Sequence, residues 1–121
     1  MKIFVLDDVP ERHETYVKRY PGHWFKHAYN VQQAKEMLVE GPYDIAFLDH
    51  DLFDWHKVDG IEEPIERTGL DVVKFLVESL PRERWPKKVV VHTWNGSRGN
   101  VMLEILKQHG VDAYYVPFSS K

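Results

Sequence analysis

The chain contains no cysteine. This absence excludes a disulfide framework, a thiolate nucleophile and a zinc site built from cysteines. No apolar run approaches the roughly 20 residues that a membrane-spanning helix needs, so no membrane partner is expected. The first residues do not form a signal peptide, because Met1 and Lys2 run directly into a short apolar stretch that ends on acids. We therefore expect a cytoplasmic protein, and both a bacterial and a phage origin fit these features.

The sequence also lacks an excess of positive charge. Its formal net charge is -3 over 121 residues, so no general electrostatic attraction to nucleic acid is expected. A polyanionic substrate would need a bound metal ion or a few well-placed cations. The 43% of hydrophobic and 29% of charged residues are typical of a globular protein. The length favours a single domain, residues 1–121, that buries about two-thirds of its unfolded surface.

Short apolar runs alternate with amphipathic stretches along the chain. They predict strands at about 2–6, 24–29, 43–48, 87–93 and 111–116, and helices at about 10–19, 31–40, 69–80 and 98–109. The segment from Phe53 to Thr68 has no clear periodicity and is acidic, so a long loop is expected there. Five strands alternating with four helices predict an α/β fold, a three-layer sandwich with a five-stranded parallel sheet.

Polar residues follow three of the expected strands. Right-handed crossovers bring the carboxyl ends of parallel strands to one edge of the sheet, where open α/β folds bind ligands. We therefore expect the polar residues after these strands to converge, namely Asp7, Asp8, Asp49, Asp51, His92 and Thr93.

The carboxylates of this set predict a divalent-metal site. Alternation along a strand points Asp49 and Asp51 to one side and His50 to the other, and neighbouring anions need a shared cation or proton. The predicted ligands are Asp7, Asp8, Asp49 and Asp51. Oxygen ligands favour magnesium, whereas an added imidazole would favour manganese or zinc. In the alternative interpretation Asp51 is a solvated turn acid and Asp8 caps the helix that Pro10 begins.

His92 follows three valines, so it either lies in the core or faces the same crevice as Asp49. We expect the crevice, where it would act as a general acid on a leaving-group oxygen or as a metal ligand. The turn at Asn95 is either a plain helix cap or a phosphate-binding helix N-terminus. Arg12 and Arg98 are either phosphate clamps or surface charges. Two tryptophans near the site would either stack on a base or pack in the core: Trp55 and Trp94.

The placement of these residues resembles the response-regulator receiver fold, a flavodoxin-like topology, over nearly the whole chain. The resemblance rests on an acidic pair after the first strand, an aspartate after the third, a hydroxyl residue after the fourth and a late proline. It implies that Asp7, Asp8 and Asp49 bind magnesium, that Asp49 accepts a phosphoryl group, and that Thr93 is the hydroxyl residue. Three features depart from it: Val116 stands where receivers carry a lysine before Pro117, the last helix is lacking, and the loop after the third strand is long.

Three motifs are more similar to a divergent branch, the cyclic-phosphate-processing receiver-like domains. They are Asp7-Asp8-x-x-x-Arg12, Leu48-Asp49-His50-Asp51-Leu52 and His92-Thr93-x-Asn95. That resemblance implies action on cyclic phosphate ends of RNA, alongside RNA repair proteins, in bacteria and phages.

We therefore expect a metal-dependent phosphoesterase-type domain whose substrate is a phosphate-containing small molecule or an RNA end. The expected catalytic residues are Asp49, His92, Asp51 and His50, and Arg12, Thr93 and Asn95 are expected to bind the phosphate. The segment 53–68 would be a lid. Two alternatives remain open: a signalling domain that is phosphorylated at Asp49 or inactive, and a binding protein without chemistry. The sequence does not indicate an oligomeric state.

Overall fold

The computed structural model describes residues 1–117. The elements follow one another in the order β1 (Lys2–Leu6), α1 (Pro10–Arg19), β2 (Trp24–Ala28), α2 (Val31–Leu38), β3 (Ile45–Leu48), β4 (Asp54–His56), β5 (Ile65–Arg67), α3 (Gly69–Glu78), a 3₁₀ turn (Arg82–Arg84), β6 (Lys88–Val91), α4 (Gly96–Gln108) and β7 (Ala113–Tyr115). No helix within these residues is both long and apolar enough to cross a bilayer.

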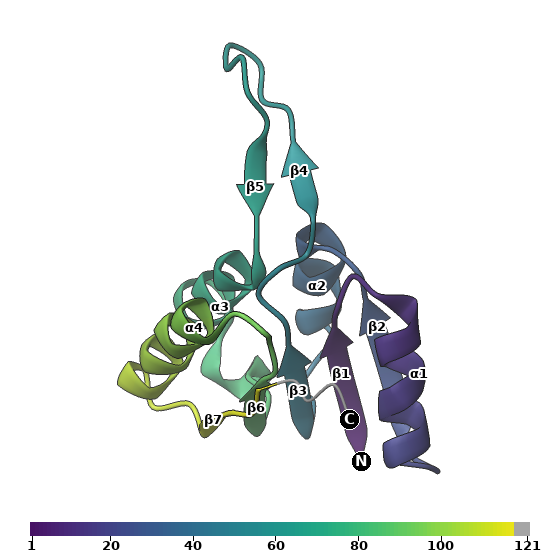
Figure 1. Ribbon diagram of the computed structural model, residues 1–121. Helices are drawn as coiled ribbons and strands as arrows, with labels where there is room; N and C mark the ends of the chain where they lie inside the picture. The colour runs from purple at the N-terminus through teal and green to yellow at the C-terminus, as the bar shows by residue number, and fades with distance from the viewer. Residues whose placement is uncertain (118–121) are drawn as a thin grey trace.

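The main sheet has five strands in the order β2-β1-β3-β6-β7, and every pair in it is parallel. Helix α1 covers one face, and α2, α3 and α4 cover the other (Figure 1). The predicted α/β three-layer sandwich of receiver type is thus confirmed. Within residues 1–117 no helix follows β7.

The central strands are apolar because both faces of the sheet are covered. In β1, Phe4 and Leu6 pack into the core under α2, α3 and α4, whereas Ile3 and Val5 pack on the other face. Tyr16 of α1 joins this second, smaller cluster. The alternating side chains of β1 therefore supply both cores, and its carboxyl end is held rigidly between two neighbouring strands.

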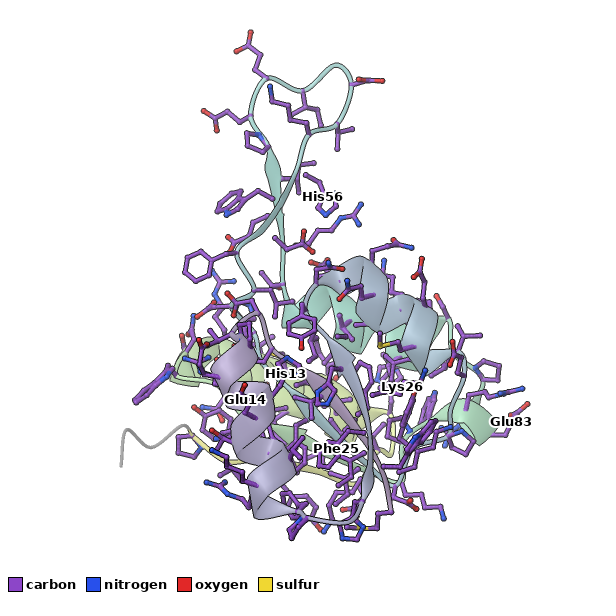
Figure 2. The ribbon with its side chains drawn as sticks, turned by 90° about the vertical axis from the view of Figure 1, so that its right-hand side faces the viewer. His13, Glu14, Phe25, Lys26, His56 and Glu83 are labelled. Atoms are coloured by element: carbon purple, nitrogen blue, oxygen red, sulfur yellow. The ribbon has the colours of Figure 1, made fainter. Side chains whose placement is uncertain are left out.

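The long connection after β3 is present, and it contains a hairpin that the sequence analysis did not predict. Strands β4 and β5 pair antiparallel and rise above the carboxyl edge of the main sheet (Figure 1). The base is anchored to α2, because the Val31 amide donates to Asp54 Oδ2 at 3.0 Å. His56, whose Nε2 lies 2.6 Å from Asp54 Oδ1, lies on this hairpin (Figure 2). Strands of three residues with mixed charged and aromatic side chains carry too little alternation to be recognised.

Two helix starts follow the sequence signals. Pro10 is the first residue of α1, as predicted, but the N-cap is Val9 and has no side-chain cap, so Asp8 does not cap this helix. Asn30 caps α2 by accepting from the Gln33 amide at 2.9 Å. The absence of a capping role leaves the Asp8 carboxylate available to the edge of the sheet.

Candidate functional site

The site lies at the carboxyl edge of the three central strands, β1, β3 and β6. Leu6, Leu48 and Val91 are in register across these strands. The Asp49 amide donates to the Leu6 carbonyl at 3.1 Å, so Asp49 lies beside the end of β1. The residues that follow the three strands therefore share one edge, below the hairpin (Figure 1).

Three carboxylates meet there. Asp7, Asp8 and Asp49 each place an oxygen within 4.8 Å of the others. Asp7 and Asp49 are 1% and 3% exposed, whereas Asp8 is half-buried. Arg12 Nη1 lies 3.5 Å from both Asp7 oxygens and 3.3 Å from Asp49 Oδ2. One guanidinium thus contacts two of the three acids, and negative charge remains in the cluster for a cation to neutralise.

Burial and crowding disfavour the charged forms of these acids. The pKa of Asp49 is raised to about 7, first by desolvation and then by the charge of Asp7. The hydrogen bond from the Thr93 side chain, the charge of Arg12 and the His50 amide oppose this shift. Desolvation also raises the pKa of Asp7, against the hydrogen bond from the Val9 amide at 2.9 Å. A bound cation would favour the ionised forms.

The donor set fits a hard divalent cation. The clustered ligands are carboxylate oxygens, which magnesium prefers, and no imidazole belongs to the cluster among residues 1–117. Within residues 1–117 the cluster lacks the imidazole on which the argument for zinc depended, whereas carboxylate oxygens suit both magnesium and manganese. Asp7, Asp8 and Asp49 are the residues that would hold the ion.

Asp51 does not join this cluster, so the structure corrects its prediction as a ligand beside Asp49. Strand β3 ends at Leu48, and the His50 amide donates back to Asp49 Oδ1 at 2.8 Å. The strict alternation of a strand therefore does not continue through Asp51. The carboxylate of Asp51 instead lies 2.6 Å from His50 Nδ1 and is 45% exposed.

A cavity of about 360 Å³ opens in front of the carboxylates, within the size range of small-ligand sites. Its lining combines acids, a cation, a hydroxyl and two aromatic rings: Asp8, Val9, Arg12, Asp49, Asp51, Phe53, Glu66, Thr93 and Trp94. Glu66 belongs to β5 and Phe53 precedes β4, so the base of the hairpin forms part of the wall. The base of this segment is therefore part of the cavity wall, and its role as a lid stays a prediction.

A second, more polar cavity of about 340 Å³ adjoins the first and shares Asp51 and Glu66 with it. Its other lining residues are His50, Thr68, Leu70, Asn95 and Arg98. Asp51 thus lies on both cavities, and its hydrogen-bond partner His50 lies on the second.

The model of the family described as "Cyclic-phosphate processing Receiver domain" matches residues 1–108 of this chain. The chain belongs to this family. The sequence-based identification of a divergent receiver-like domain is therefore confirmed. Among curated proteins no relative matches significantly.

Solved structures show that the fold of this cyclic-phosphate-processing receiver domain is the receiver fold. A response regulator from Burkholderia pseudomallei, with a phosphorylated aspartic acid, a calcium ion and citrate, matches with a TM-score of 0.67 and 17% identity over 99% of this chain. The present chain spans 61% of that protein. The BeF3-activated receiver domain of Klebsiella pneumoniae RstA matches with a TM-score of 0.67, 17% identity, and coverage of 100% of this chain and 88% of that one. Thermotoga maritima TrrA, in complex with Mg(2+)-BeF, matches with a TM-score of 0.62, 21% identity, and coverage of 98% and 88%.

Two further predicted residues of this receiver domain lie near the acids. Thr93 is buried and lines the carboxylate cavity beside Asp49. Asn95 lines the second cavity, and its Oδ1 accepts from the Arg98 amide at 3.2 Å as the N-cap of α4. The plain cap interpretation therefore accounts for the Asn95 side chain.

His92 is not brought to the carboxylate cavity, and its predicted place in the crevice is wrong. It lines a separate cavity of about 180 Å³ on the α1 face, with Tyr16, Arg19 and Val90 among its neighbours. The Tyr16 hydroxyl hydrogen-bonds His92 Nδ1. Desolvation and the charges of Arg19 and Arg12 lower the pKa of His92 to about 4. His92 has the strand phase of Val90 rather than that of Val91, so it points to the α1 face.

Sequence reasoning missed one aromatic residue of the site and one partner of a predicted residue. Phe53 lines the carboxylate cavity, and Tyr16 holds His92. Nothing in the local sequence distinguishes Phe53 from a core phenylalanine. Tyr16 could have been found from its position on the buried side of α1, opposite the strand that carries His92.

Proposed function

We propose that this domain is a metal-dependent phosphoesterase that acts on cyclic phosphates, with the 2′,3′-cyclic phosphate end of an RNA as its physiological substrate. The observation that carries the proposal is the cluster of Asp7, Asp8 and Asp49, two of which line a ligand-sized cavity together with Arg12. Membership of a family described as cyclic-phosphate processing supports the same chemistry. RNA repair proteins of a bacterium or phage are the partners that such a substrate implies.

The three aspartates would hold the divalent cation, and magnesium matches their oxygen donors best. When bound, the ion supplies Lewis-acid polarisation of a phosphoryl oxygen and a more acidic water. Arg12 lies against Asp7 and Asp49 with its side chain 30% exposed, so its guanidinium can donate to a phosphate oxygen in the cavity. The Thr93 hydroxyl lines the same wall.

The Asp51–His50 pair is the best placed acid–base unit. Asp51 lines the carboxylate cavity, and its carboxylate lies 2.6 Å from His50 Nδ1, which orients it. In hydrolysis, water attacks phosphorus, one phosphorus–oxygen bond of the ring breaks, and the freed ribose oxygen takes up a proton. We assign to Asp51 the acceptance of the proton from water, with the pair returning a proton to the ribose oxygen.

Turnover of a substrate panel tests this function. Purified protein is incubated with magnesium, manganese or zinc and with 2′,3′-cyclic and linear phosphodiesters. The proposal predicts metal-dependent opening of the cyclic substrates and its loss in Asp49→Asn. Asp112→Asn, an exposed acid that precedes β7 at the opposite edge of the sheet, is the matched control and keeps activity. Absence of turnover with all three metals contradicts the proposal.

A second candidate function is phosphoryl signalling through Asp49. The buried Asp49 beside Asp7, Asp8 and Thr93 favours it, and a phosphorylated aspartic acid is present in the similar Burkholderia response regulator. Val116, where receivers carry a lysine, counts against it. A mass gain of one phosphate from acetyl phosphate, lost in Asp49→Asn, would support signalling over hydrolysis.

A further inference from the structure

Two exposed aromatic side chains border the cavity that contains Asp49. Phe53 follows β3 and is 79% exposed, and Trp94 follows β6 and is 57% exposed. Both rings line the carboxylate cavity, because β3 and β6 are neighbours in the sheet. Exposed apolar surface is unfavourable in water, and neither side chain belongs to the core clusters of the described residues.

The backbone of Phe53 is also unusual. Its φ is +48°, and it is the one non-glycine residue with positive φ among those that the structure describes. A bulky L-residue in this region is strained by contact between its Cβ and the backbone. Phe53 thus has neither a packing nor a backbone reason to be phenylalanine. Strain of this kind persists where function requires it.

The wall of the cavity combines charged and aromatic side chains. Asp8, Asp49 and Arg12 supply the charged part of the wall, which can hold a cation and a phosphate, and Phe53 and Trp94 add aromatic side chains to the same wall. A cyclic phosphate on a ribose without a base would contact only the charged side chains of this wall. A nucleotide has a flat base one sugar away from its phosphate, and aromatic side chains stack on every base because each base has a π-face.

We infer that Phe53 and Trp94 stack on a nucleobase and thereby restrict the substrate to nucleotides. This inference rests on the proposed function, because it takes the phosphate to lie at the three carboxylates. The ligand class is a nucleoside 2′,3′-cyclic phosphate, either free or at the end of an RNA. Stacking gives little preference among the bases, so recognition of the base is general rather than sequence-specific.

Other exposed tryptophans differ from Trp94 and serve as references. Trp55 is 56% exposed on β4 but does not line the cavity. Trp24 is also 56% exposed, lies on the edge strand β2, and has the ammonium groups of Lys2 and Lys26 over its ring. Trp24 is the first residue of β2, so it lies at the amino end of its strand and away from the carboxyl edge that carries the site. It is therefore the matched control for loss of an exposed indole.

Calorimetric binding in the presence of magnesium tests the inference without requiring turnover. The probes are the four nucleoside 2′,3′-cyclic phosphates, a base-free methyl riboside 2′,3′-cyclic phosphate, and a short RNA that ends in a cyclic phosphate. The wild type is expected to bind nucleotides about 5- to 150-fold more tightly than the base-free probe, the range that one stacked base supplies. Trp94→Ala is expected to lose most of this difference, and Trp24→Ala to retain it.

Phe53→Gly separates binding from folding. Glycine relieves the left-handed backbone, so its unfolding temperature should equal or exceed that of the wild type while nucleotide affinity falls. Equal binding of nucleotide and base-free probes, no nucleotide binding, or unchanged affinity in both Trp94→Ala and Phe53→Gly overturns the inference. Trp94-dependent binding without any turnover supports the inference and contradicts the proposed function. Tighter binding of the free nucleoside 2′,3′-cyclic phosphates would identify a free nucleotide as the ligand. Tighter binding of the RNA would identify an RNA end.

Discussion

Arg12 Nη1 lies 3.3 Å from Asp49 Oδ2 and connects the first helix to the end of the central strand β3. The same nitrogen lies 3.5 Å from Asp7 Oδ1 at the end of β1. One side chain therefore compensates charge from two strand ends that are 42 positions apart in numbering yet adjacent in the sheet. Removal of Arg12 should disturb both acids at once.

Arg12→Ala should destabilise the fold by about 1–3 kcal/mol near pH 8, because it leaves buried carboxylates without their cation. Near pH 4 the loss should shrink, since protonated acids need no partner. Urea unfolding at the two pH values measures this. Arg98→Ala, on the second cavity, is the control. A loss that is equal at both pH values would contradict the role of charge.

Asp49→Asn should make the protein more stable near pH 8. The pKa of Asp49 is about 7 in the folded protein and 3.8 as the reference, so between these values the folded state binds the extra proton. Protonation of Asp49 therefore stabilises the folded state fully below about pH 4, and this contribution is lost as the pH rises through about 7. The asparagine variant avoids that loss, on the order of 4 kcal/mol from the shift. Chemical unfolding across this range should show the two proteins converging near pH 4; parallel curves would contradict the raised pKa.

Magnesium should stabilise the wild type more at about pH 8 than at about pH 5.5. Cation binding needs ionised Asp7 and Asp49, and the raised pKa of each means that protons compete with the ion at lower pH. Thermal unfolding with and without magnesium measures the shift, and a chelator should reverse it. Asp49→Asn should lose most of the shift. A shift that is independent of pH would indicate binding elsewhere.

Gly69→Ala should destabilise the fold by about 2–4 kcal/mol. A Cβ at Gly69 would lie 2.0 Å from the Asp49 carbonyl oxygen and 3.0 Å from His50 Cα, and backbone atoms cannot move aside without shifting Asp49. The Gly69 amide also donates to the His50 carbonyl at 2.8 Å. Gly96→Ala is the control, since its Cβ meets only the Tyr115 hydroxyl at 3.7 Å. Equal unfolding midpoints for both variants would contradict this packing.

His92→Ala should lower stability but retain turnover. His92 is hydrogen-bonded to the buried Tyr16 hydroxyl, so its removal takes this partner from the hydroxyl at a cost of about 1–3 kcal/mol. It does not line the carboxylate cavity, and its pKa of about 4 keeps it neutral near pH 7. Unfolding and initial rates on a cyclic phosphate measure the two effects. Loss of turnover in a folded variant would restore the catalytic role predicted from sequence.

The fold and the acidic cluster could be predicted because both follow from strand order. Asp7 and Asp49 directly follow buried apolar strands, and parallel strands with right-handed crossovers leave no other edge for them. The sequence pattern determines where a strand ends, and hence where its next residue lies. The position of the strand end is therefore sufficient to place Asp7 and Asp49.

Three other placements, those of Asp51, Phe53 and His92, could not be predicted in this way. Asp51 lies on the cavity wall but pairs with His50 instead of joining the three carboxylates, and His92 is hydrogen-bonded to Tyr16 on the α1 face. Phe53 owes its place on the cavity to a left-handed backbone that no sequence pattern marks. These placements depend on tertiary hydrogen bonds and turn geometry rather than on periodicity.

The most direct test of the account is phosphorus NMR of a nucleoside 2′,3′-cyclic phosphate incubated with the protein, with magnesium and with a chelator. The account predicts that the cyclic signal converts to a monoester signal only when magnesium is present and Asp49 is intact. An unchanged cyclic signal with magnesium, manganese and zinc, or conversion by Asp49→Asn at the wild-type rate, would contradict it.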